Sequence, residues 1–211
     1  KSGYQTAHIG KIHMAHLKGK EHIRPGFDYW YSFIGQGDYF NPMVNDNGNE
    51  YKEIGYITDI LTDKTLEWLE KQRDPSKPFY LKLWHKGIKA YDSAWKSYNS
   101  VPRLPIKKWP VKGDKFMKLL RCLKSIDESL GVVIKKLDEM GELDNTVIIF
   151  SSDNGYFMGE HTYWDKRIAY ENSMRIPMII RYPKLIKQHT RIEDMCLNID
   201  LAPTILDLIG T

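Results

Sequence analysis

The sequence predicts an α/β fold in which helices flank a largely parallel central sheet. The first observation behind this prediction is that short apolar runs alternate along the chain with long stretches of helical spacing. The second is the segment NTVIIFSS at 145–152, whose continuous apolar run is typical of strands buried in a parallel sheet. Strands and helices that alternate in this way pack as layers around one sheet.

The first half of the chain supplies two strands and a helix. Residues 4–13 hold a helix end and then a short strand, and a long polar and aromatic loop follows. Helical spacing covers 56–72, where apolar residues recur three or four positions apart. We expect Thr58 or Asp59 to cap this helix and RDPSKP to end it. The aromatic run FYLKLW at 79–84 alternates as a strand does.

The second half begins with residues 87–113, which are rich in Pro, Lys and Trp without clear periodicity and predict an irregular surface excursion. The longest helix is expected over 116–140, because its apolar positions keep a spacing of three or four, and Gly141 closes it. A strand is expected at 176–183. A last helix is expected at 200–210, with a proline in its first turn and a glycine at its end.

Composition narrows the class of protein. Apolar residues make up 42% of the 211 positions, which is enough for a substantial core. Basic residues exceed acidic ones by only 31 − 27 = 4, so we expect no nucleic-acid partner; a basic cluster at 105–115 is either a solvated loop or a patch for anionic polymers. The two cysteines lack metal-binding spacing, and Cys122 is predicted to be a small core residue. No apolar run is long enough to span a membrane.

The pair Asp153-Asn154 is the clearest candidate site. It follows the apolar run at 147–150, and ligands of α/β sheets collect at the carboxyl ends of the strands. A carboxylate oxygen beside an amide oxygen suits a hard divalent cation such as Ca²⁺ or Mg²⁺. The alternative is a plain turn, because Asp-Asn-Gly is a favoured way to leave a strand.

Cationic and imidazole side chains stand at the ends of several predicted strands, and Lys166, Arg167 and Arg175 precede the strand expected at 176–183. A lysine as a fixed positive charge and a histidine as a donor suit a tetrahedral oxyanion, but each is also consistent with a surface ion pair or a structural histidine. Because several strand ends share one edge of such a sheet, their recurrence favours a common site. The candidates are Lys11, His13, His85, Lys86, Lys89, His161, Lys166, Arg167 and Arg175.

Taken in order, the segments resemble the sulfatase family of the alkaline-phosphatase-like superfamily. GYQTAHIGKIHM resembles the family signature G-Y-x-T-x-x-I-G-K-W-H, with Ile12 in place of Trp, and LDNTVIIFSSDNGYFMGEH resembles its L-x-N-T-x-V-x-F-x-S-D-N-G element. RPGFDYW, GQGDYFNP, DPSKPFYLKLWHK, DKRIAYENSMRIPMIIRYP and NIDLAPTILDLIG resemble further blocks in the familiar order. The resemblance implies a partial sulfatase catalytic domain over 1–211 whose sheet lacks its first strand.

The resemblance also implies a reaction and its cofactors. Family members hydrolyse sulfate esters, here of carbohydrate or aryl type, with one Ca²⁺ ion and a formylglycine nucleophile made from a cysteine. Asp153 and Asn154 match the two residues of the family motif that bind the calcium ion. The implied partner is a sulfated small molecule or glycan, and the family suggests a secreted, periplasmic or lysosomal location.

Further residue roles follow from the same resemblance. Lys11 and His13 match the pair that contacts the modified nucleophile and the sulfate. Lys166 matches the lysine that touches the sulfate or its leaving oxygen, and His161 is a further candidate for substrate binding. Lys89 stands where the family has the histidine that assists the leaving group. A lysine can donate a proton, although its ordinary pKa near 10.4 makes it a slow acid at neutral pH.

Two family elements do not occur among the 211 residues. These are the opening Asp pair and the motif C-x-[PA]-S-R, since neither Cys122 nor Cys196 is followed by that pattern. We therefore expect an N-terminally truncated chain whose nucleophile lies upstream, and we expect the 211 residues by themselves to be inactive. Two alternatives remain open: a non-catalytic sulfatase-like protein that binds anionic glycans, and a phosphoesterase of the same superfamily.

Overall fold

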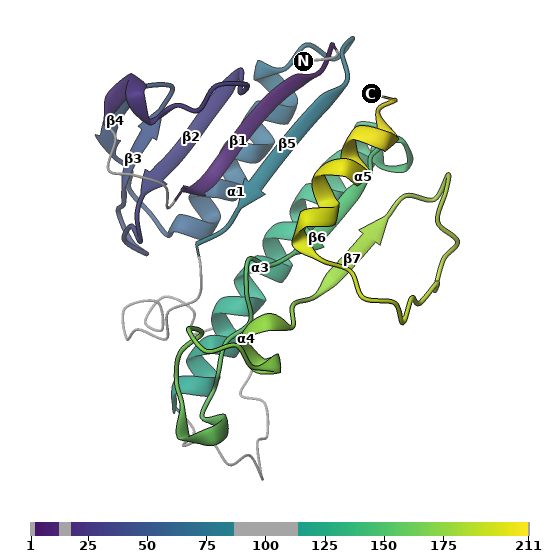
Figure 1. The fold of residues 1–211 in the computed structure, drawn as a ribbon. Coiled ribbons are helices and arrows are strands. Elements are labelled where there is room, and N and C mark those ends of the chain that lie inside the picture. The colour runs from purple at the N-terminus through teal and green to yellow at the C-terminus, as the bar shows by residue number, and fades with distance from the viewer. Residues whose placement is uncertain (1–2, 13–17, 87–113, 211) are drawn as a thin grey trace. The chain divides into compact units, whose positions relative to one another are not determined.

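The computed structural model describes residues 3–12, 18–86 and 114–210 (Figure 1). The chain divides into two compact units, Lys1–Lys136 and Leu137–Thr211, and each is described by itself. The predicted excursion at 87–113 lies outside the described residues. Helices and strands alternate along the chain, and the predicted α/β class is confirmed.

A five-stranded sheet in the order β4-β3-β2-β1-β5 forms the first unit. Its strands are β1 (Gln5–Ile12), β2 (Tyr29–Ile34), β3 (Met43–Asp46), β4 (Asn49–Lys52) and β5 (Phe79–Trp84). The central strand β1 runs parallel to both β2 and β5, whereas β3 and β4 extend the sheet as an antiparallel edge. The strands predicted within 4–13 and at 79–84 are therefore confirmed, and their carboxyl ends share one edge of the sheet. The helix end expected within 4–13 is wrong, and the stretch expected to be a long loop holds β2, β3 and β4.

Gly10 allows β1 and β5 to approach each other closely. In this register Gly10 lies opposite Trp84, and a Cβ atom at Gly10 would come within 1.9 Å of the carbonyl oxygen of Trp84. The φ of Gly10 is +129°, which side-chain-bearing residues rarely adopt. A glycine is needed here, and it precedes Lys11 at the carboxyl end of β1.

Helix α1 (Ile57–Glu67) lies against β1 and buries Ile57 and Leu61 completely. It continues as a π-helical segment, Trp68–Gln72, and ends at Arg73 as predicted. The predicted cap is wrong: Tyr56 occupies the N-cap and makes no side-chain capping bond. The tertiary packing explains this, because Thr58 is buried inside the first turn, where its side chain cannot serve as a cap.

Helix α3 (Asp114–Glu139) is the longest in the chain's described part, and Gly141 follows it with a φ of +69°. Both features match the sequence prediction, and Cys122 is buried as expected. A buried polar chain links α3 to α1: the hydroxyl oxygens of Thr62 and Ser129 lie 2.6 Å apart, and Thr62 donates to the Thr58 carbonyl oxygen.

The second unit pairs β6 (Ile148–Ser151) with β7 (Met178–Arg181) and adds α4 (Glu171–Met174) and α5 (Leu201–Leu208). The apolar run at 147–150 does form a strand, but the prediction of a buried parallel strand is wrong. β6 runs antiparallel to β7, and its residues are half-buried. A continuous apolar run reports how much of a strand is covered and not the direction of the strand beside it.

Helix α5 agrees with its prediction, because Pro203 lies in its first turn and Gly210 follows it with a φ of +74°. No helix that the structure describes has both the length and the apolar character needed to cross a bilayer.

His8 makes the first unit sensitive to acid. Its ring stacks on Trp30 with centroids 4.4 Å apart, and its Nε2 is buried without a hydrogen-bond partner. Burial lowers the pKa of His8 to about 4, and the neighbouring Lys82 and His22 add to the effect. Folded and unfolded chains therefore bind protons differently between pH 6.5 and 4, where only the unfolded chain takes up a proton at this position.

We predict that protonation of His8 in the unfolded chain lowers the unfolding free energy by roughly 3 kcal/mol as the pH falls from 6.5 to 4. Each unit of pKa difference corresponds to about 1.4 kcal/mol. Urea unfolding at pH 7 and pH 5 measures the loss. The variant His8→Phe keeps an aromatic ring on Trp30 but cannot titrate, so its stability should fall less between these two pH values. An equal fall in both proteins would contradict this role of His8.

Candidate functional site

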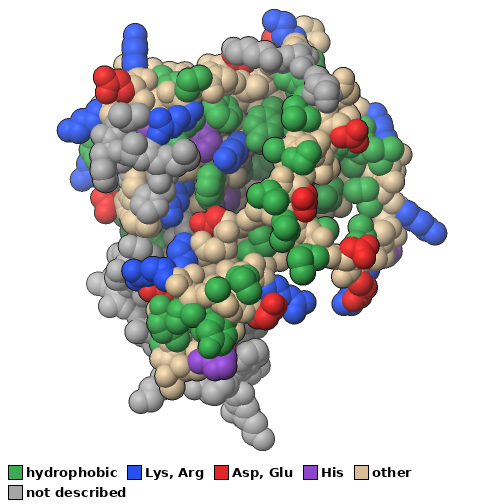
Figure 2. Space-filling view, viewed as in Figure 1, with side chains coloured by type: hydrophobic (Ala, Val, Ile, Leu, Met, Phe, Trp, Pro, Cys, Tyr) green, Lys and Arg blue, Asp and Glu red, His purple; other side chains and the backbone are tan. Residues whose placement is uncertain are grey.

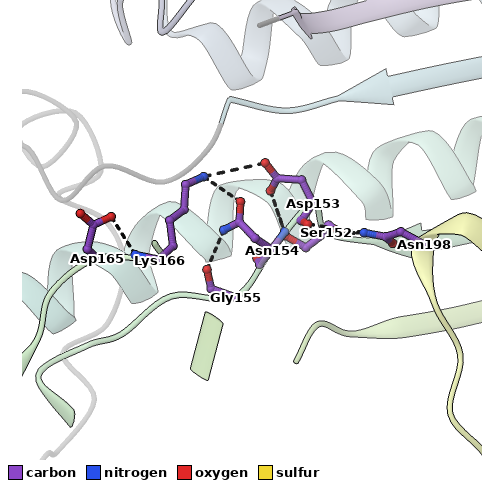
Figure 3. A network of polar contacts seen from close by, with 7 residues as sticks. All are labelled: Ser152, Asp153, Asn154, Gly155, Asp165, Lys166 and Asn198. Atoms are coloured by element: carbon purple, nitrogen blue, oxygen red, sulfur yellow. Dashed lines mark hydrogen bonds and ion pairs between the residues drawn. The ribbon is translucent and has the colours of Figure 1, made fainter. Parts of the chain in front are cut away.

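The ammonium group of Lys166 contacts both residues of the predicted metal-binding pair. Its Nζ donates to Asn154 Oδ1 at 2.7 Å and lies 3.9 Å from Asp153 Oδ2 (Figure 3). Asp153 and Asn154 follow β6 directly, and Lys166 comes from the hairpin that returns twelve residues later. Both side chains of the ion pair are about half exposed, which leaves this cluster open to solvent.

The residues that form the turn after β6 are also residues of the candidate site. Asp153 Oδ1 accepts a hydrogen bond from the Asn154 backbone N–H at 3.0 Å, and Ser152 Oγ donates to the Asn154 carbonyl oxygen at 3.0 Å. These local bonds make the turn that the sequence suggested as an alternative. They use only Oδ1 of Asp153, so that Oδ2 stays directed at the ammonium of Lys166.

Gly155 holds this turn against α4. Its N–H donates to the Ser173 carbonyl oxygen at 2.7 Å, and a Cβ atom at Gly155 would lie 2.2 Å from the carbonyl oxygen of Asn172. Backbone this close leaves no room for a side chain. The third residue of Asp-Asn-Gly therefore fixes where the first two present their oxygens.

Asp165 makes different hydrogen bonds with its two cationic neighbours, Lys166 and Arg167. Its Oδ1 accepts from the Lys166 backbone N–H at 2.7 Å, and its Oδ2 accepts from Arg167 Nε at 2.8 Å. The hydrogen bond from Arg167 is the main reason that the pKa of Asp165 lies below its usual range. Arg167 is thus paired with Asp165, whereas the ammonium of Lys166 faces Asp153 and Asn154.

Asn198 is a contributor that the sequence analysis did not single out. Its Nδ2 lies 3.3 Å from the Ser152 carbonyl oxygen and 3.4 Å from that of Asp153, and it comes from the turn before α5 (Figure 3). It therefore contacts the backbone of the turn from a segment 46 residues further along the chain. The only signal for it was its place in the block NIDLAPTILDLIG.

His161 lies in another environment from Lys166. Its ring contacts Phe157 and Tyr170, with centroid distances of 6.2 and 5.4 Å, and its φ is +52°. Its described contacts are aromatic, so they support a structural part in the hairpin, and its predicted role in substrate binding stays a prediction.

The remaining candidates belong to the first unit. Lys11 is buried at the end of β1. His85 Nε2 lies 3.1 Å from Ser129 Oγ, and Lys86 Nζ donates to the carbonyl oxygens of Gln36 and Gly37. His13 and Lys89 lie outside the described residues. The predicted meeting of Lys11 with the cluster around Lys166 therefore stays a prediction.

The oxygen pair suits part of a calcium site. Asp153 Oδ2 and Asn154 Oδ1 both face the Lys166 ammonium. Calcium needs about six to eight oxygen ligands. Within the described ranges no three or more His, Cys, Asp or Glu side chains are grouped to hold a metal ion. Asp153 and Asn154 can supply two ligands, and the others must come from elsewhere.

Gly155 gives a direct test of how the turn is held. We predict that Gly155→Ala lowers the unfolding free energy by roughly 2 kcal/mol or more, because the added methyl group overlaps the Asn172 carbonyl oxygen. Thermal unfolding of the two proteins measures the effect.

Gly131→Ala is the matched control for this substitution. Gly131 lies within α3, and nothing stands within 4 Å of its would-be Cβ. This change should be neutral or stabilise by up to about 1 kcal/mol, because alanine favours helix. If both variants unfold like the parent chain, the close approach at Gly155 is not a constraint.

Comparison with known proteins bears on this geometry. A family model described as Sulfatase matches residues 1–211. The N-acetylglucosamine-6-O-sulfatase of Bacteroides thetaiotaomicron is 32% identical over 298 residues, an alignment that covers 99% of this chain and 52% of that protein. The N-acetylglucosamine-6-sulfatase of Homo sapiens is 30% identical over 245 residues. That alignment covers 99% of this chain and 44% of that protein.

Solved structures agree with the sequence relatives. The structure of BT4656 in complex with its substrate D-glucosamine-2-N,6-O-disulfate superimposes with a TM-score of 0.81 at 29% identity. The match covers 100% of this chain and 59% of that one. The chain spans about half the length of the curated relatives it matches.

Proposed function

The chain belongs to the sulfatase family, and from this premise we propose that the protein hydrolyses a sulfate ester of a sugar to the free alcohol and sulfate. Residues 1–211 form part of the catalytic domain in this proposal. The observation that carries it is the contact of Lys166 with Asp153 and Asn154, which gathers a cation and two oxygen ligands at the carboxyl end of β6. Relatives named for N-acetylglucosamine 6-sulfate favour an amino-sugar sulfate as the substrate.

In this proposed mechanism, Asp153 and Asn154 are the residues that would bind the calcium ion. Asp153 Oδ2 and Asn154 Oδ1 would hold one calcium ion, and a bound calcium ion would withdraw charge from a sulfuryl oxygen. The bonds from Ser152 and Asn198 keep the two oxygens oriented before any ligand arrives. Such preorganised groups stabilise developing charge without a reorganisation cost during the reaction.

Lys166 has the second part. Its ammonium lies within reach of both side-chain oxygens, Asp153 Oδ2 and Asn154 Oδ1. Were a cation held by the two oxygens, like charges would repel, and the flexible side chain of Lys166 would place its ammonium on the sulfate instead. There it offsets negative charge on a sulfuryl oxygen or on the departing alcohol oxygen. Lys11, His13 and Lys89 are proposed to meet the same ester from the other strand ends.

The nucleophile of the family is formylglycine, and the motif that yields it does not occur among the 211 residues. The overall change is R–O–SO₃⁻ plus water to R–OH plus hydrogen sulfate, in which the S–O bond breaks and water supplies the new oxygen and proton. Family membership alone also leads us to propose a secreted, periplasmic or lysosomal location.

We expect Lys166→Met to raise the calcium affinity of the full-length protein by about fivefold, since removing a like charge at ~4 Å relieves about 1 kcal/mol in water. Asp153→Asn should weaken calcium binding, because it removes a negatively charged ligand. Calcium titration by calorimetry measures both effects. Weaker calcium binding in Lys166→Met would contradict the shared position of the two cations.

We expect the full-length protein to release sulfate from glucosamine 6-sulfate and to leave glucosamine 6-phosphate intact. Lys166→Ala should lower kcat/KM by about a hundredfold or more, as for other single groups that stabilise transition-state charge. Lys187→Ala, which removes an exposed lysine from the same unit, is the control. Release of phosphate instead would point to a phosphoesterase. Binding without release of either anion would point to a non-catalytic binder of anionic glycans.

A further inference from the structure

The chain at 185–208 carries many large apolar side chains that are exposed, and we call it the apolar stretch. Met195 is 87% exposed, Ile199 is 76% exposed and Leu185 is 70% exposed. Figure 2 shows hydrophobic side chains at the surface in the right-hand half of the view, where α5 and β7 lie in Figure 1. Exposed apolar surface on this scale marks a place where another molecule or another part of the chain packs. The exposed members include Leu185, Ile192, Met195, Leu197, Ile199 and Leu206.

Helix α5, which ends the apolar stretch, has the composition of a helix from a protein core. Its sequence LAPTILDL carries one charged residue, Asp207, and no basic residue. A helix that is apolar on nearly every side is normally buried. No residue of α5 is buried in the structure, however. The helix therefore lacks the packing for which its sequence is suited.

The second unit does not supply that packing from its own residues. Of residues 141–210, all of which the structure describes, only Phe157 and Ser173 are buried. Neither of them lies in the apolar stretch. Its sheet has two strands, and a two-stranded sheet needs a further strand or a covering helix to be stable. Because small units become stable by burying an apolar core, the second unit depends on chain that lies outside it.

The composition of the apolar stretch at its α5 end favours a protein segment as the group that covers it. From position 195 to position 210 the only charged residues are Asp200 and Asp207. Depletion of charged residues is typical of the buried centre of a protein–protein interface. A helix that lies on a membrane surface carries Lys and Arg on its polar face, and α5 carries neither. An anionic glycan would likewise meet no positive charge on α5.

We propose that the apolar stretch is the surface on which a part of the full-length chain outside residues 1–211 packs. The chain spans about half the length of the curated relatives it matches, so proteins of their size hold further residues that can cover it. Large apolar surfaces with few charges are typical of permanent interfaces and not of transient ones. The segment that packs here therefore presents apolar side chains of its own.

The same packing steadies the candidate site. Asn198 lies in the apolar stretch between Leu197 and Ile199, and its Nδ2 contacts the carbonyl oxygens of Ser152 and Asp153. Once Leu197 and Ile199 are covered, the backbone at Asn198 is fixed. Its amide group then stays on the turn that carries Asp153.

A matched pair of substitutions in the full-length protein tests whether the stretch is covered. Ile199→Ser should lower the midpoint of thermal unfolding by about 3 °C or more, because it removes apolar contacts inside an interface. Ile54→Ser is the control, since Ile54 is 73% exposed and lies between Glu53 and Gly55 in the first unit. This change should shift the midpoint by about 1 °C or less. An unchanged midpoint in Ile199→Ser, or an equal fall in both variants, would overturn the proposal.

Photo-cross-linking identifies what covers the stretch. The photo-reactive amino acid p-benzoylphenylalanine replaces Leu206 in the full-length protein, and mass spectrometry maps the cross-linked peptides after illumination. We expect a cross-link within one molecule to a peptide outside residues 1–211. A cross-link to residues 1–136, a cross-link between two copies of the protein, or no cross-link would each overturn the proposal. Neither experiment depends on sulfate release, so a failure of the proposed hydrolysis leaves this test intact.

Discussion

The contact between one ammonium group and two neighbouring side-chain oxygens joins two loop segments of the second unit. Lys166 Nζ lies 2.7 Å from Asn154 Oδ1 and 3.9 Å from Asp153 Oδ2. It ties the turn after β6 to the segment around Lys166. A solvent-exposed ion pair contributes little to stability by itself. Its importance here is positional, because Gly155 and Asn198 hold the same turn from two other directions.

The elements that could be predicted from the sequence are those whose apolar spacing extends over several turns or alternates clearly. The long helix before Gly141, the strand at 79–84 and the helix with Pro203 were predicted correctly for this reason. The pairing of β6 could not be predicted in the same way. Its apolar run indicates burial, whereas its direction relative to β7 depends on a partner thirty residues away. The cap of α1 failed because burial of Thr58 outweighed its local preference.

Some residues of the candidate site could be predicted from the sequence, and others could not. Asp153 and Asn154 were found from their residue types and from their place after a strand, whereas Lys166 was found from the resemblance of the DKR block. The structure brings the three together. Asn198 was missed because its amide contacts backbone carbonyl oxygens, which leave no pattern in a sequence.

The most direct test of this account is a crystal structure of the full-length protein with calcium and sulfate bound. The account predicts one calcium ion about 2.3–2.6 Å from both Asp153 Oδ2 and Asn154 Oδ1. It also predicts that the Lys166 ammonium leaves Asn154 and contacts a sulfate oxygen. A structure in which Lys166 stays on Asn154, with the calcium ion held by other residues, would contradict the account.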